Sequence, residues 1–239
     1  MKSQASRRAR TSWVGGVMAV LVVMSSMAGC TTTQQMPVQR PAAGGFLGDP
    51  SLLTPGDKEQ TSLRYVNPSV QWTQYNKLLL EPVTFWGDDK TKISVKDQQM
   101  LCNFLHEQLY DQLSKKYQMV TEPGEGVMKL QVALVDADSA TPVLRTISMA
   151  VPQARLLSTL KYLATGTYPF IGEAEAEAKM TDSVTGQLMG EWVDKRVGGG
   201  NIKTAAQWQW GDAENAMKEW ATTAATRLSS WTSGAVKPS

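Results

Sequence analysis

The sequence predicts an α+β domain, in which a mixed and largely antiparallel sheet carries helices mainly on one of its faces. Two observations support this fold class. Apolar residues recur at three-and-four spacing in some segments and at every second position in others, which are the periods of helix and strand. These segments follow one another in the order β-α-β-β-α-β-β-α, without an internal repeat. A chain of 239 residues can bury enough surface in one core to need no disulfide.

The N-terminal part of the predicted domain is irregular and leads into the first strand. Residues 45–57 contain the turn dipeptides Asp-Pro and Pro-Gly around short apolar groups. We expect three of their side chains to pack onto the domain: Phe46, Leu52 and Leu53. Residues 76–86 are mostly large or β-branched and include Pro82, which predicts a strand with a bulge or an edge position at the proline.

The clearest predicted helix follows Ser94. This serine is a suitable N-cap, and Asp97 three residues later makes a variant of the capping box. Five apolar residues then form one stripe: Leu101, Phe104, Leu105, Leu109 and Leu113. Residues 117–122 and 127–138 are predicted strands separated by a Pro-Gly-Glu-Gly turn, and we expect them to pair as a hairpin.

Helix propensity and strand periodicity conflict in the next segment. Pro152 is placed to open a helix through residues 153–164. Glu173, Glu175 and Glu177 then alternate strictly with alanines, and although both residue types favour helices, the alternation is that of a strand. A strand would place the glutamates on a solvated face and the alanines on a face that a helix can approach closely. A turn and a second alternating segment follow, so we predict a hairpin.

The last predicted helix begins at Gly211 or Asp212 and runs through Trp231. Its apolar stripe consists of Met217, Trp220, Ala224, Leu228 and Trp231. With it, a single α+β domain covers residues 46–232, and residues 233–239 are expected to be a disordered tail.

The first 29 residues have the layout of a secretory signal peptide. Four basic residues lie within the first ten positions, and no acidic residue precedes Asp49. The uncharged stretch 13–27 is shorter than the about 20 apolar residues of a membrane span. Removing residues 1–29 takes away four basic residues and no acidic one, so the formal net charge changes from +2 to −2. We therefore expect no nucleic-acid partner.

Met27, Ala28, Gly29 and Cys30 resemble the lipobox of bacterial lipoproteins, with methionine in place of the usual leucine. The resemblance implies cleavage between Gly29 and Cys30, lipidation of the Cys30 thiol and attachment to the membrane through its acyl chains. The alternative is that Cys30 is an ordinary residue after an uncleaved signal anchor or a cut elsewhere.

The residue after the cysteine bears on location in Gram-negative lipoproteins. Thr31 is not the aspartate associated with inner-membrane retention, which implies a periplasm-facing site at the outer membrane. Residues 30–45 lack hydrophobic periodicity and are rich in Thr, Gln, Pro and Gly. We expect a flexible tether there, with ordered structure beginning near Phe46.

Few residues are candidates for catalysis or metal binding. Cys102 and the only histidine, His106, lie one helical turn apart and could bind a metal or form a nucleophile with its base. Zinc sites use about three or four protein ligands, however, and no second such cluster is present. We expect no catalytic residue, no metal and no cofactor, with Cys102 as an unpaired thiol at the edge of the apolar stripe.

Two further groups are candidates for binding. The three alternating glutamates could attract cations or a basic partner, or could be a solvated sheet face with three cross-strand cations: Lys179, Lys195 and Arg196. Trp208 and Trp210 lie in a polar segment, where exposed indoles would form a partner-binding anchor. Burial against the last helix is the alternative.

Five segments carry a resemblance that spans roughly residues 46–231. They read GFLGDPSLLTPG, LRYVNPSVQW, KLLLEPVTFW, VPQARLLSTLKYLATGTYPFIGEAEAEAKMTDSVTGQLMGEWVDKRVGG and WGDAENAMKEWA. In this order they resemble an uncharacterised family of bacterial lipoproteins, the domain of unknown function 3313. The resemblance implies an exported, lipid-anchored periplasmic domain and brings no activity or catalytic residue with it.

Three functions follow as hypotheses. The first is a non-enzymatic binding or adaptor module for an envelope protein or a cell-wall component, with an exposed aromatic patch. The second is a carrier of a small apolar ligand in a pocket between sheet and helices, which requires an apolar cavity of roughly a few hundred Å³. The third is an enzyme that uses two carboxylates with perturbed pKa values in one cleft.

Overall fold

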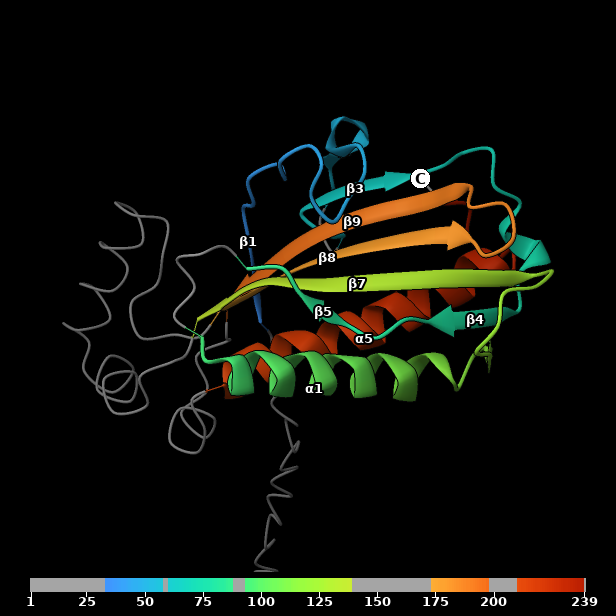
Figure 1. The fold of residues 1–239 in the computed structure, drawn as a ribbon. Helices are drawn as coiled ribbons and strands as arrows, with labels where there is room; N and C mark the ends of the chain where they lie inside the picture. The colour runs from blue at the N-terminus through green and yellow to red at the C-terminus, as the bar shows by residue number, and fades with distance from the viewer. Residues whose placement is uncertain (1–32, 58–59, 88–92, 139–172, 198–209, 239) are drawn as a thin grey trace, which may run out of the picture. The chain divides into compact units, whose positions relative to one another are not determined.

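The computed structural model describes residues 33–57, 60–87, 93–138, 173–197 and 210–238. In this part of the chain, nine strands form one mixed sheet, and the α-helices α1 (Val95–Leu113) and α5 (Gly211–Thr232) lie side by side on one of its faces (Figure 1). The predicted α+β class is confirmed. The helix predicted at 153–164 lies outside the described residues. None of the described helices is long and apolar enough to cross a membrane.

The sheet has the strand order β2-β3-β9-β8-β7-β4-β6, with β1 also paired to β9 and β5 to β7. Parallel pairs join β4 to β6, β4 to β7 and β5 to β7, and the remaining pairs are antiparallel. The strands are β1 (Gln34–Met36), β2 (Thr54–Pro55), β3 (Leu63–Val66), β4 (Lys77–Leu80), β5 (Thr84–Phe85), β6 (Gln118–Met119), β7 (Val127–Asp138), β8 (Glu173–Asp182) and β9 (Leu188–Val197).

The predicted hairpin between residues 117–122 and 127–138 is wrong. β6 and β7 do not pair with each other, because each pairs in parallel with β4. The connection from β4 through α1 is long enough to return the chain as a parallel strand, so β6 takes the sheet edge beside β4. The single strand predicted over residues 76–86 is divided into β4 and β5, and Pro82, where the sequence predicts a bulge or an edge position, lies between them.

Helix α1 begins and packs as predicted. The Ser94 hydroxyl oxygen accepts a hydrogen bond of 3.1 Å from the backbone N–H of Asp97, which caps the first turn. The buried stripe of α1 faces the core, and α5 packs against α1. The buried residues of α5 include four alanines: Ala213, Ala216, Ala221 and Ala225.

The β8–β9 hairpin is confirmed, but the prediction of a solvated glutamate face is wrong. The alternation places Ala174 on the helix side, as expected, whereas Glu173 and Glu177 on the other side are buried. Part of that second face is covered by a small core of Leu47, Leu53, Leu63 and Val193, with Phe46 packed against it. Leu53 and Phe46 therefore pack as predicted, but Leu52 is exposed and Leu47 is buried instead.

Ordered structure begins before Phe46, so the expected start of the domain is wrong. Gln34, Gln35 and Met36 pair with Val197, Arg196 and Lys195 of β9. A strand edge offers unpaired backbone donors and acceptors whatever the side chains are, and a polar segment can satisfy them. Hydrophobic periodicity therefore could not reveal β1.

Candidate functional site

The candidate site is a pocket of about 120 Å³ lined by the sheet and α5, with Leu105 and Leu109 of α1 also in its lining. The strand period brings the even-numbered residues of β8 and β9 to this face. Its walls are apolar, and the main contributors are Leu109, Val132, Ala178, Met180, Trp192, Trp220, Leu228 and Trp231. Six polar residues also line the pocket, and we call this group the rim: Gln60, Thr61, Asp194, Arg196, Thr223 and Arg227. The lining therefore combines mainly apolar walls with one group of polar and charged residues.

Tryptophans form one wall of this pocket. Trp192 of β9 stacks on Trp231 of α5 with ring centroids 6.3 Å apart. Trp72 meets the Trp231 ring edge-on, with centroids 5.0 Å apart. The Trp192 ring lies over Gly190, where an added Cβ would come within 2.6 Å of the indole. Glycine at that position is what allows the ring to lie flat along the strand.

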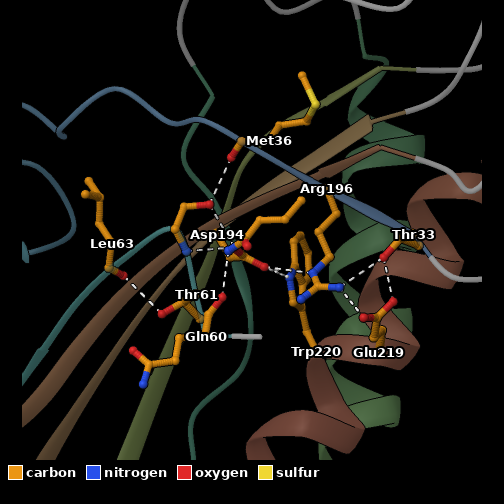
Figure 2. A network of polar contacts seen from close by, with 11 residues as sticks. Thr33, Met36, Gln60, Thr61, Leu63, Asp194, Arg196, Glu219 and Trp220 are labelled. Atoms are coloured by element: carbon orange, nitrogen blue, oxygen red, sulfur yellow. Dashed lines mark hydrogen bonds and ion pairs between the residues drawn. The ribbon is translucent and has the colours of Figure 1, made fainter. Parts of the chain in front are cut away.

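The Asp194 carboxylate accepts hydrogen bonds from several segments that meet at the pocket (Figure 2). Its Oδ1 accepts hydrogen bonds from Gln35 Nε2 at 2.7 Å and from the backbone and hydroxyl of Ser62 at 2.9 Å each. Its Oδ2 accepts from Arg196 Nε and from Trp220 Nε1, both at 2.8 Å. The side chain is buried, and a carboxylate saturated in this way is a structural group and not a free base.

Arg196 extends the same network to the first described residue (Figure 2). Its Nη1 donates to the Thr33 hydroxyl at 3.2 Å and forms an ion pair with Glu219 of α5. The Thr33 hydroxyl in turn donates to Glu219 Oε2 at 2.6 Å. Arg196 therefore faces the helices, and the expectation that it neighbours the strand glutamates is wrong because it pairs with Ala174 across the sheet.

Arg64 lies beside the pocket on β3, directly across from Trp192 in the sheet. Its side chain is only 7% exposed, and its Nη2 has no hydrogen-bond partner. Burial lowers the pKa of Arg64, and the positive charge of Arg227 lowers it further, while Asp57 acts in the opposite direction. The pocket-lining Arg227 is thus close enough to Arg64 for the two charges to interact, and Arg64 has an unsatisfied buried donor.

The other face of the sheet buries two carboxylates. Glu177 is 6% exposed and Glu191 is 1% exposed, and burial raises the pKa of both side chains, with the charge of Glu191 raising that of Glu177 further. They accept backbone hydrogen bonds from Leu47 and Gly48 respectively. The pKa values of Glu177 and Glu191 are both raised, as the hypothesis of a carboxylate enzyme requires. The hydrogen bonds from the backbone, however, place both side chains against residues 47–48.

A second cleft, of about 300 Å³, is lined by aromatic and polar side chains near this covered region. Phe46 and Trp86 meet edge to face at 5.7 Å, and the Lys179 ammonium lies 5.3 Å from the Phe46 ring centroid. Trp86 is 50% exposed, and Glu81 and Gln131 complete the cleft. This is an exposed aromatic surface that the sequence analysis did not identify.

The residues predicted from sequence meet different outcomes. Gly29, Cys30 and Trp208 lie outside the described residues. Trp210 is only 4% exposed and belongs to the main core, so the prediction of an exposed indole is wrong at this position and the alternative, a buried indole, is correct. It immediately precedes α5 and is buried with that helix.

Cys102 and His106 do not form a reactive pair. Burial raises the pKa of the Cys102 thiol to about 11, so it stays protonated at neutral pH. Among the described residues, no cluster of His, Cys, Asp or Glu is arranged to hold a metal ion. The cysteine packs in the core beside the α1 stripe, as predicted.

Sequence reasoning missed Arg64, Asp194 and Arg227. For Asp194 a signal exists, because it shares the period of Trp192 and so had to point toward the helices. Arg64 lies in a four-residue strand, which is too short to show a period, and Arg227 could be placed at the pocket only by tertiary packing.

Comparison with known proteins finds a family and distant structural likenesses. No curated protein matches the chain. The PelC dodecamer from Paraburkholderia phytofirmans has 7% identity and a TM-score of 0.37, over 67% of this chain and 95% of that one. A family DUF330 protein from Xanthomonas campestris has 12% identity and a TM-score of 0.40, over 72% and 94%.

A putative neuraminyllactose-binding hemagglutinin homolog from Helicobacter pylori has 10% identity and a TM-score of 0.29, over 68% of this chain and 85% of that one. Likenesses of this size identify no shared function. The family comparison is of a different kind, because the model of a protein family of unknown function matches residues 42–224. The chain belongs to that family, DUF3313.

Proposed function

We propose that this protein is a lipid-anchored, periplasm-facing outer-membrane protein that acts as a non-enzymatic binding module for an apolar ligand. The observation that carries the ligand class is the pocket between α5 and the sheet, whose walls are apolar and include Trp192, Trp220 and Trp231. Its volume of about 120 Å³ approaches that of engineered apolar cavities, roughly 150 Å³, that bind benzene. It is smaller than the roughly 300 Å³ and more of typical ligand pockets, so it suits the end of an apolar chain.

Titration with 1-decanol, followed by tryptophan fluorescence, tests this function. Ala224→Phe adds a ring to the pocket lining, whereas Thr222→Phe adds the same ring on the exposed side of the same helix. We expect decanol to change the fluorescence saturably, with binding lost in Ala224→Phe and retained in Thr222→Phe. Equal binding by both variants, or no saturable binding by the natural chain, contradicts an apolar site in this pocket.

The anchor is the second part of the proposal, and the lipobox resemblance at Cys30 supports it. Thr33 is held by Arg196 and Glu219, so only two residues separate the anchored cysteine from the domain surface. Three extended residues span at most about 11 Å. A lipidated Cys30 would therefore keep the β1 end of the domain close to the bilayer instead of releasing it on a long tether.

Replacement of the anchor residue tests this part. Cys30→Ser should abolish incorporation of labelled palmitate and release the domain from the membrane fraction, while Cys102→Ser should leave both unchanged. Density separation of inner and outer membranes then tests the outer-membrane location. Unchanged labelling and fractionation of Cys30→Ser contradicts lipidation there.

A second candidate function, an adaptor for an envelope protein or cell-wall component, is favoured by the exposed aromatic cleft of Phe46 and Trp86. An aromatic side chain that is half exposed and backed by a second ring is typical of a binding anchor. A photo-crosslinker placed at Trp86 should capture an envelope partner in cells, and one at Val184, which is more exposed than Trp86, serves as the control. Recovery of the same proteins from both positions contradicts this candidate.

A further inference from the structure

We propose that the pocket binds an anionic single-chain amphiphile, with its apolar tail among the tryptophans and its acidic headgroup beside Arg64 and Arg227. This inference rests on the proposed function and specifies the chemistry of the ligand. Three observations carry it: the position of Arg64, its unsatisfied donor and the proximity of a second arginine.

The sheet places Arg64 where a headgroup would lie. In an antiparallel pair, directly opposite residues project from the same face, so Arg64 and the pocket-lining Trp192 are neighbours. Gln60 and Thr61, a few residues before Arg64, belong to the rim of the same pocket. A molecule whose tail lies on Trp192 therefore has Arg64 beside it.

The guanidinium of Arg64 is incompletely satisfied. The side chain is more than nine-tenths buried, and its Nη2 atom has no hydrogen-bond partner. A buried charged donor costs free energy unless an acceptor meets it. A carboxylate or phosphate is the acceptor that the planar guanidinium binds most favourably.

The charges around Arg64 favour an anion over a cation. Arg227, which lines the pocket from α5, is close enough for its charge to lower the pKa of Arg64. Arg227 already has an interaction within the protein. What favours an anion is that two positively charged side chains lie near each other, and this does not require Arg227 to lack a partner. Asp57 acts on Arg64 with the opposite sign but is exposed, and the nearby Asp194 is engaged by Arg196.

The test compares three ligands with the same tail: decanoate, decyl phosphate and 1-decanol. The full chain should bind at least one of the two anions about tenfold more tightly than decanol, since a hydrogen bond to a charged group is worth about one factor of ten. The preference should weaken as salt is added, while decanol binding should not. The tighter anion assigns the headgroup to the carboxylate or to the phosphate class.

Variants locate the effect. Arg64→Gln and Arg227→Gln should each lose most of the anion preference and keep the affinity for decanol, which also shows that the pocket is intact. Lys115→Gln removes an exposed positive charge just after α1 and should change neither. Arg64→Lys keeps the charge without the planar fork and should retain part of the preference.

The outcomes separate this inference from the proposed function. If decanol binds as tightly as both anions, or if the preference survives in both glutamine variants, the headgroup assignment is overturned while the apolar site stands. If none of the three ligands binds, the proposed function itself fails.

Discussion

At the scale of single residues, the two buried glutamates show how a strand pattern can mislead. Glu177 and Glu191 alternate as solvated residues should, yet the chain before η1 (Pro50–Leu52) covers them and supplies backbone donors from Leu47 and Gly48. One backbone hydrogen bond offsets only part of the cost of removing a carboxylate from water, and one oxygen of Glu191 has no partner. The raised pKa of each side chain follows from this deficit.

Glu191→Gln should stabilise the protein at neutral pH. Burial raises the pKa of Glu191 in the folded chain above its ordinary value of 4.5. The folded state thus binds more protons than the unfolded state between 4.5 and the raised pKa, and the free energy of unfolding falls as the pH rises through that window. The neutral amide removes this loss, so urea denaturation should show Glu191→Gln to be more stable than the natural chain at pH 7.

The advantage should shrink as the pH is lowered toward 4.5. Glu125→Gln, at an exposed position, is the control and should follow the natural chain at every pH. A Glu191→Gln variant that is less stable at pH 7 would show that the charge of Glu191 contributes favourably.

Gly190→Ala should perturb the tryptophan wall. The new Cβ would lie 2.6 Å from the Trp192 ring and 3.0 Å from the Tyr65 carbonyl oxygen, so the indole must move. Overpacking of this kind costs about 1–3 kcal/mol. Thermal unfolding should show the loss, and tryptophan fluorescence should shift because Trp192 leaves its stack on Trp231. Gly48→Ala, whose Cβ would meet nothing within 4 Å, should change neither signal.

At the scale of elements, α1 is the part of the fold whose local signals agree with its tertiary role. Its cap, its apolar stripe and its length all follow from the residues themselves. β6 illustrates the opposite case, because two residues of strand carry too little pattern to specify a partner, and the crossover through α1 decides the pairing. Short strands are therefore positioned by the elements around them.

Ser94→Ala should remove the cap of α1 at a cost of about 1 kcal/mol. The hydroxyl bond to the Asp97 N–H would be lost, leaving one N–H of the first turn without its acceptor. Chemical denaturation should show the lower stability, and hydrogen exchange should be faster in the first turn than in the natural chain. Ser69→Ala, at an exposed loop position, is the matched control, and an equal loss in both variants would rule out a capping effect.

At the scale of the whole molecule, the Asp194 network joins parts that are far apart in sequence. It links Gln35 and Ser62 with β9 and with Trp220 of α5, and through Arg196 it reaches Thr33. These contacts fasten the N-terminal strand to the same helix that forms one wall of the pocket. Strand β1 and the wall of the proposed ligand site are thereby parts of one connected network.

Asp194→Asn should cost about 1.5–3 kcal/mol, because it removes one of the two carboxylates that pair with the buried Arg196 and leaves only Glu219. The amide can accept at one oxygen only, so the bonds to Gln35, Ser62 and Trp220 cannot all persist. Limited proteolysis should then cut near β1 faster than in the natural chain. Asp111→Asn breaks an exposed pair with Lys115 and should change stability by less than about 1 kcal/mol. Similar losses in both variants would contradict a structural role for the network.

The sequence by itself determined the α+β class, helix α1 with its cap, the β8–β9 hairpin, the core position of Cys102 and the family resemblance. All of these rest on local periodicity, capping or motif, which neighbouring residues define. Only the tertiary structure decided that β1 is ordered, that the glutamate face is covered, that Trp210 is buried and that Arg64 lies beside Trp192 and near Arg227. These four features depend on which distant segments of the chain pack together. The spacing of apolar residues along one segment shows whether it is a strand or a helix, but not which other segment it contacts.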